Sequence, residues 1–124
     1  MLQTYKAELF KALGHPTRIH ILELLRNGEQ TVSELQEQLE AEMPAVSQQL
    51  AVLRNRQIVE SRKEGINNYY SVTDEQVFEL LDVARAMFDR QLETLQAMAA
   101  ADDAFQSELE ERDPSSSGEA PSER

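Results

Sequence analysis

The stretch MPAVSQQLAVLRNRQIVESRKEGINNYYSVTD, residues 43–74, contains a change of period that decides the fold. Its first part repeats apolar residues every three or four positions, which predicts a helix with Pro44 in its first turn. Its second part holds two short runs of β-branched, aromatic and charged residues, 58–63 and 68–73, on either side of residues 64–67. Because the connection contains a glycine, these runs predict a β-hairpin directly after the helix.

The sequence before this stretch predicts three helices. The first, which ends at Gly14-His15-Pro16, has apolar residues on one face: Leu2, Tyr5, Leu9 and Leu13. The second, residues 17–26, is apolar nearly all round and is therefore expected in the centre of the core. The third, residues 33–39, is short and amphipathic.

A long helix is predicted after the hairpin. Thr73 to Gln76 fits a capping box, in which the Thr73 hydroxyl accepts a hydrogen bond from the backbone of Gln76. One apolar stripe continues to about Ala100, and a helix of that length extends about 39 Å. A small domain cannot cover such a helix, so we expect a homodimer through the first and last helices. The residues expected at this interface are Leu2, Tyr5, Leu9, Phe88 and Leu95.

Two helices joined by a tight turn and followed by a basic hairpin predict a winged helix-turn-helix, a mainly α fold with a small β-hairpin wing. Its second helix enters the major groove of DNA. Residues 43–63 carry four basic side chains against one acidic side chain, a local net charge of +3 in an acidic chain. The predicted DNA-binding residues are Ala45, Ser47, Gln48, Gln49, Arg54, Arg56, Arg62 and Lys63.

The roles within this set are expected to differ. Gln48 and Gln49 suit base recognition because an amide can form paired hydrogen bonds with adenine, and Ser47 adapts to several acceptors. The four basic residues are expected mainly to bind phosphates and to position the protein. The alternative for this helix face is an ordinary solvated surface. Residues 29–42 carry five glutamates and no basic residue, which should weaken nonspecific binding.

The composition restricts the class of protein. The 124 residues carry a formal net charge of −11, which argues against coating nucleic acid by charge alone. Because there is no cysteine, disulfides, thiolate metal ligands and thiol nucleophiles are excluded. No apolar run could span a membrane and no signal peptide is evident, so a cytoplasmic protein is expected. An enzyme is the weakest class, because neither histidine has a credible nucleophile partner.

The charge also divides the chain. Residues 101–124 carry eight acidic and two basic side chains, a net charge of −6. We expect one DNA-binding and dimerisation domain over residues 1–100 and an acidic, disordered tail over residues 101–124. The tail is either a solubilising end or a segment that competes with DNA phosphates for the basic surface.

The motifs ALGHPTRIHILELL, AVSQQLAVLR and VESRKEGINNYYSV resemble the ArsR family of bacterial winged-helix repressors, and the likeness extends over roughly residues 8–90. The resemblance implies a homodimer that binds double-stranded DNA at an inverted-repeat operator. It also implies release of the operator when a metal or another inducer binds elsewhere. The sequence names neither the operator nor the inducer.

The resemblance allows the sensing positions of the family to be compared. Thr31 and Ser33 stand where the arsenic and cadmium type carries cysteines, so that site is absent. The positions that match the zinc and nickel type are Asp74, Gln76, Met87 and Arg90. Only the aspartate remains there, and an acid in the first turn of a helix has a structural explanation.

The histidines are the remaining metal candidates. His15 and His20 are imidazoles that suit nickel or zinc, but a site needs three or more converging ligands. The alternatives are a turn residue for His15 and a helix-surface residue for His20. No cofactor is otherwise evident.

The leading hypothesis is a homodimeric, sequence-specific repressor, and its rival is a winged-helix protein-interaction module with little DNA specificity.

Overall fold

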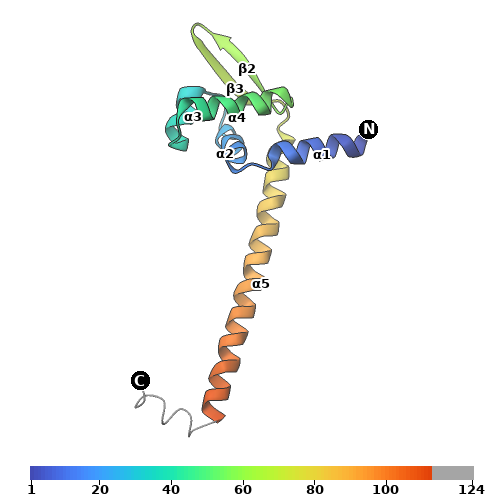
Figure 1. Cartoon of the computed structure of the whole chain (residues 1–124), viewed down its shortest axis with the longest axis vertical. Helices are drawn as coiled ribbons and strands as arrows, with labels where there is room; N and C mark the ends of the chain where they lie inside the picture. The colour runs from blue at the N-terminus through green and yellow to red at the C-terminus, as the bar shows by residue number, and fades with distance from the viewer. Residues whose placement is uncertain (113–124) are drawn as a thin grey trace. The chain divides into compact units, whose positions relative to one another are not determined.

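The structure, a computed structural model, describes residues 1–112 and falls into two units (Figure 1). The first unit, Met1–Leu81, contains α1 (Leu2–Leu13), α2 (Pro16–Leu25), β1 (Gln30–Thr31), α3 (Val32–Leu39), α4 (Met43–Asn55), β2 (Val59–Glu64) and β3 (Asn67–Val72). α5 (Gln76–Arg112) begins there and, from Asp82 onward, forms the second unit. The element order confirms the predicted winged helix-turn-helix.

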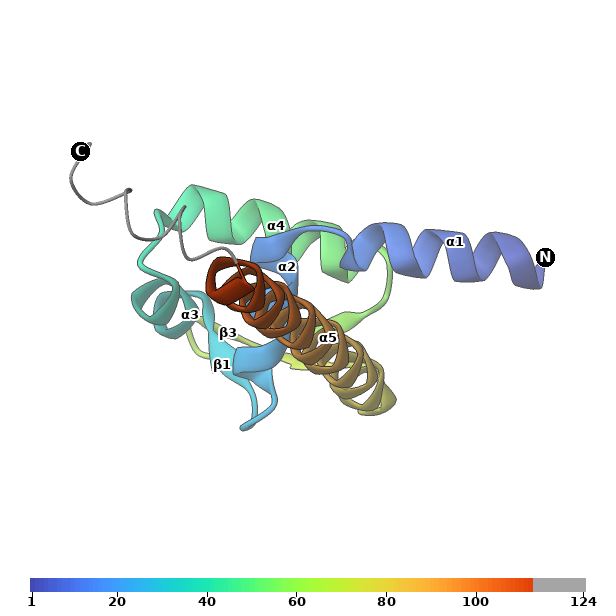
Figure 2. The same cartoon turned by 90° about the horizontal axis from the view of Figure 1, so that it is seen from below.

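α2 lies at the centre of the first unit, as its apolar composition predicted. Ile21 and Leu22 are 0% exposed, and the helix contacts α1, α3, α4 and β3 (Figure 2). α2 begins after His15, whose Nδ1 accepts a hydrogen bond from the backbone N–H of Thr17 at 3.1 Å. Pro16 follows in the first turn, where its missing N–H removes no helical hydrogen bond.

A capping box begins α3. The Thr31 hydroxyl accepts from the backbone N–H of Glu34 at 3.2 Å, and the Glu34 carboxylate accepts from the backbone N–H of Thr31 at 2.8 Å. The helix therefore begins at Val32, one residue before the predicted start. Thr31 also ends β1, a strand that the sequence analysis missed because two residues are too short to show a period.

The wing is an antiparallel sheet with strand order β1-β3-β2. β2 pairs with β3 from Val59 opposite Val72 to Glu64 opposite Asn67, which leaves a two-residue turn. Gly65 occupies the first turn position with φ of 63°, a conformation that favours glycine. The predicted hairpin is confirmed.

The start of α5 departs from the predicted capping box. The backbone N–H of Gln76 donates to Asp74 Oδ1 at 2.9 Å, so Asp74, and not Thr73, supplies the side-chain cap. An aspartate can bond the backbone two residues further on, which competes with a cap from the preceding threonine. Asp74 therefore has the structural role that its position in the sequence suggested.

The end of α5 corrects the prediction of a disordered tail. Residues 101–112 are helical, so α5 continues past the predicted end near Ala100. Alanine is the strongest helix former, and Ala99 to Ala101 lead into Phe105 and Leu109, which extend the apolar stripe. The division into two units falls after Leu81, within α5; the predicted DNA-binding and dimerisation domain over residues 1–100 stays a prediction. The remainder of the predicted tail, residues 113–124, lies outside the described residues.

No helix within residues 1–112 is both long enough and apolar enough to cross a membrane.

Thr31→Ala tests the capping box. Removing the hydroxyl that accepts from Glu34 N–H should lower the free energy of unfolding by about 1 kcal/mol, measured by urea denaturation. Ser33→Ala is the control, because Ser33 is exposed in the same helical turn. Equal stability losses in both variants would contradict a specific role for the cap.

Candidate nucleic-acid interface

α4 presents a polar face because its apolar residues are taken up by the core. Val46, Leu50 and Leu53 are buried, and the residues on other sides of the helix include Ala45, Ser47 and Gln48, all exposed. At about 100° per residue, Gln48 lies nearly opposite the buried stripe. The structure thus places these three predicted DNA-binding residues on the solvent side of the recognition helix.

Gln49 differs from its neighbour because it lies at the edge of this face. The residue is half-buried, and its Oε1 accepts a hydrogen bond from Arg18 Nη1 at 2.9 Å. Arg18 Nε also donates to the backbone oxygen of Ala12 at 2.6 Å. Gln49 is therefore connected through Arg18 to α2 and to the end of α1, so its oxygen already has a partner inside the protein.

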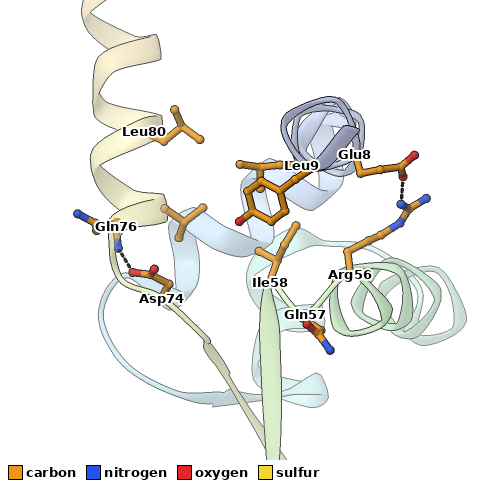
Figure 3. A pocket seen from close by; sticks show the side chains of 10 residues that line it. Glu8, Leu9, Arg56, Gln57, Ile58, Asp74, Gln76 and Leu80 are labelled. Carbon is orange, nitrogen blue, oxygen red and sulfur yellow. Dashed lines mark hydrogen bonds and ion pairs between the residues drawn. The ribbon is translucent and has the colours of Figure 1, made fainter. Parts of the chain in front are cut away.

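Arg56, just after α4, forms an ion pair with Glu8 of α1, and Figure 3 shows the two side chains facing each other. The Glu8 oxygen in this pair is shielded from water. Arg54 is exposed and has no ion pair or side-chain hydrogen bond within residues 1–112. Of the two predicted phosphate-binding arginines on this segment, only Arg54 is free to act without breaking an internal contact.

Arg62, in β2 of the wing, has more partners than Arg54 or Arg56. Arg62 donates to Glu29 and to Glu64, with nitrogen–oxygen distances of 2.5 Å in both ion pairs, and its guanidinium lies 4.9 Å from the centroid of the Tyr69 ring. The hydrogen bond with Arg62 lowers the pKa of the Glu29 carboxyl. The hydrogen bonds with Glu29 and Glu64 raise the pKa of the Arg62 guanidinium.

These internal pairs reduce the positive charge that the interface offers. Because the pKa of Glu29 is lowered, its pair with Arg62 is present above the ordinary pKa of a glutamate and is lost as the pH falls through the lowered value. Lys63, next in the strand, is exposed and has no ion pair within the described part of the chain. Of the four basic side chains behind the predicted local charge of +3, only Arg54 and Lys63 have no carboxylate partner within residues 1–112.

Three residues that contact the predicted DNA-binding side chains were not predicted from the sequence: Glu8, Arg18 and Glu29. Each contacts a residue that is distant in the sequence; for example, 33 residues separate Glu29 from Arg62. No local spacing could reveal such contacts. The only hint was the run of glutamates over residues 29–42, whose first member is the partner of Arg62.

A cavity of about 360 Å³ lies between α1, the connection from α4 to β2, and the start of α5 (Figure 3). Its apolar lining comes from five residues: Tyr5, Leu9, Ile58, Val77 and Leu80. Its polar lining includes the ion-paired Glu8 and Arg56. Asp74 and Gln76, which match two metal-ligand positions of the family, also line it, and Asp74 Oδ1 accepts from the backbone N–H of Gln76 in the α5 cap.

In the described residues, His15 and His20 do not lie in a cluster of potential metal ligands. Residues 1–112 contain no group of three or more histidines, aspartates and glutamates that could hold a metal ion. His15 uses Nδ1 to cap α2, while His20 is exposed on the same helix. A nickel or zinc site at these residues stays a prediction, and it would need ligands from beyond residue 112 or from a second copy of the chain.

The predicted dimer residues are mostly exposed apolar side chains. Leu2 and Tyr5 on α1 are exposed, as are Phe88 at 57% and Leu95 at 62% on α5. Leu9 differs, because it is half-buried and packs against the core of its own chain. Four of the five residues thus have surface available for a partner.

The comparisons with known proteins agree with this geometry. The family model described as bacterial regulatory protein, arsR family, matches residues 15–61. The HTH-type transcriptional regulator Rv0081 of Mycobacterium tuberculosis is 44% identical over 92 residues, which cover 73% of this chain and 81% of that protein. The chain belongs to the ArsR family. It is therefore a winged helix-turn-helix transcriptional regulator, and the expectation that it is not an enzyme is confirmed.

Solved structures and further relatives of this ArsR-family chain support the same fold. The crystal structure of Rv0081 has a TM-score of 0.68 at 43% identity, covering 74% of this chain and 93% of that one. The homodimeric winged helix-turn-helix DNA-binding domain of Mb0332 from Mycobacterium bovis has a TM-score of 0.67 at 32% identity, covering 74% of this chain and 85% of that one. The biofilm growth-associated repressor of Agrobacterium fabrum is 36% identical over 85 residues, 68% of this chain and 73% of that protein.

Glu29→Gln tests whether the wing carboxylate competes with DNA. The change removes a charged partner of Arg62 and should raise affinity for nonspecific DNA by up to about fivefold, because Arg62 no longer has to exchange this carboxylate for a phosphate. The measurement is fluorescence anisotropy with labelled duplex DNA at two salt concentrations.

Glu37→Gln is the matched control for this experiment. Glu37 is exposed on α3, belongs to the same acidic segment and has no ion pair in the described residues. An equal gain in both variants would mean that only net charge matters and that the contact between Glu29 and Arg62 does not.

Proposed function

We propose that this ArsR-family regulator is a sequence-specific repressor that binds an inverted-repeat operator in double-stranded DNA as a homodimer. The observation that carries the proposal is the exposed polar face of α4. Ser47 and Gln48 have no side-chain partner within residues 1–112, and the helix beneath them is anchored by Val46, Leu50 and Leu53. A rigid helix with free polar groups suits base recognition in the major groove.

Dimerisation would supply the second half-site. Exposed apolar residues on α1 and α5, among them Tyr5, Phe88 and Leu95, favour burial against a second copy. The related Mb0332 domain is homodimeric. A two-fold symmetric dimer pairs with an inverted repeat, because each recognition helix then meets the same sequence.

The electrostatics of the surface favour selective binding over nonspecific binding. Arg54 and Lys63 can reach phosphates without losing an internal partner, whereas Arg56 and Arg62 must exchange a carboxylate for a phosphate. Nonspecific affinity comes from phosphate neutralisation, so these exchanges lower it. Base contacts are then needed to hold the protein on its operator.

A selection from random duplex DNA tests this function, and Gln48→Ala is the informative variant. The wild type should select an inverted repeat, and Gln48→Ala should reduce the preference for it over random DNA by about tenfold, since a good base contact contributes about 1 to 3 kcal/mol. Lys63→Ala is the control, because loss of a phosphate contact should weaken binding to both DNAs equally.

The possible results of this selection separate the competing functions. Equal losses of preference in both variants would contradict base recognition by α4. No preference in the wild type would favour a protein-interaction module. The same selection with Ni²⁺ or Zn²⁺ tests a metal response through His15 and His20, which predicts that the metal releases the operator from the wild type and not from the double alanine variant.

Phe88→Asp tests the proposed dimer. An unpaired carboxylate in an apolar interface is costly, so the dimer dissociation constant should rise at least about tenfold, as measured by sedimentation equilibrium. Ala97→Asp is the control, because Ala97 is exposed and lies about 180° from Phe88 around α5. Dissociation in both variants, or in neither, would contradict an interface on the Phe88 side.

A further inference from the structure

Arg18 connects the recognition helix to two other helices through one guanidinium group. Its Nη1 donates to Gln49 Oε1 of α4 at 2.9 Å. Its Nε and Nη2 donate to the backbone oxygens of Ala12 and Lys11 at the end of α1, at 2.6 and 3.4 Å. All three donating nitrogens are thus engaged, and each acceptor belongs to an element other than α2.

The chemistry of arginine settles which way the Gln49 amide points. A guanidinium has only donors, so the amide atom that faces Arg18 must be the oxygen and not the nitrogen. The Nε2 group of Gln49 then carries two N–H donors that have no partner within residues 1–112. The exposed Gln48 has both its oxygen and its nitrogen free.

The energies of the competing hydrogen bonds favour keeping this orientation. A hydrogen bond to a charged group is roughly twice as strong as a neutral one. To pair with adenine through both atoms, Gln49 would have to accept from the N6 amine while it donates to N7. It would then give up or weaken the bond with Arg18 for a neutral one.

We propose that Arg18 is a positioning residue that makes Gln49 a donor only toward DNA. Gln49 then selects a base edge that presents an acceptor, such as N7 or O6 of guanine, N7 of adenine or O4 of thymine. It disfavours cytosine, whose major-groove edge presents an amino donor. The inference rests on the proposed binding of DNA by α4.

The same contact makes base recognition dependent on α1. The backbone carbonyls of Lys11 and Ala12 accept from the other two donating nitrogens of Arg18 and so help to fix its guanidinium beside Gln49. α1 also carries exposed apolar residues of the proposed dimer interface, Leu2 and Tyr5. The helix that is expected to form the dimer thus takes part, through Arg18, in orienting one amide of the proposed base-recognising face.

The first arm of the test uses Gln49→Glu in the full chain. Glutamate keeps the shape and an oxygen for Arg18 but has no N–H group, so the thermal melting temperature should stay within a few degrees of the wild type. In a selection from random DNA, this variant should lose its preference at one base pair of each half-site. A merely structural role of Gln49 would leave the selected sequence unchanged.

The second arm uses modified bases in an operator that carries adenine at that position. For the wild type, replacing adenine with the unsubstituted base purine removes the N6 amine and should change affinity by less than twofold. By contrast, 7-deazaadenine removes the N7 acceptor and should weaken binding about fivefold, the value of one hydrogen bond. In Gln49→Glu, the penalty for 7-deazaadenine should disappear.

A third arm uses Arg18→Met, which frees the Gln49 oxygen. This variant should gain sensitivity to removal of the adenine amine, because the amide can then use both atoms. If it does not fold, the analogue results with the wild type and Gln49→Glu decide alone.

Three results would overturn the inference and are distinct from failure of the proposed function. They are a fivefold loss in the wild type on removal of the amine, a 7-deazaadenine penalty that persists in Gln49→Glu, and a uniform loss on all sequences in that variant. The last would place Gln49 at a phosphate. A wild type without any sequence preference would instead refute the proposed function itself, and the inference with it.

Discussion

Burial of α2 is the constraint on which the rest of the first unit depends. Ile21 and Leu22 are fully buried, and α1, α3, α4 and β3 all contact the helix that carries them. Replacing a buried leucine or isoleucine with alanine commonly costs about 2 to 5 kcal/mol, which is a large share of the stability of a small domain. The polar link from Arg18 to Gln49 works because α2 is held in place by this core.

Carboxylates are a second organising feature, because they occupy basic residues that face the candidate DNA surface. Glu8 pairs with Arg56, while Glu29 and Glu64 pair with Arg62. The two pairs of Arg62 are exposed and contribute little to stability, so a phosphate can replace these carboxylates. Their main effect is to lower the positive potential of the free protein. The acidic net charge of −11 thus acts at this surface through carboxylates that are paired with particular arginines.

The elements of the fold could be predicted because their signals are local. Periodicity located the helices, Gly65 located the wing turn, and the three apolar residues Val46, Leu50 and Leu53 identified the buried side of α4. The errors have local causes as well. Thr73 and Asp74 are both good caps, and the structure uses Asp74, while the acidic composition of residues 101–112 concealed a continuing helix. The site contacts could not be predicted, because Arg18 and Gln49 lie 31 residues apart.

Gln48 and Gln49 illustrate why residue type alone cannot assign a role at a recognition helix. They are chemically identical neighbours, but a rotation of about 100° per residue separates their surroundings. Gln48 lies nearly opposite the buried stripe and is exposed, while Gln49 lies beside α2 and meets Arg18. Within residues 1–112, both amide atoms of Gln48 have no partner, whereas the Gln49 oxygen accepts from Arg18 and only its Nε2 group has none. The hydrogen-bonding groups that α4 exposes are therefore determined by its packing on α2, and not only by the side chains that α4 carries.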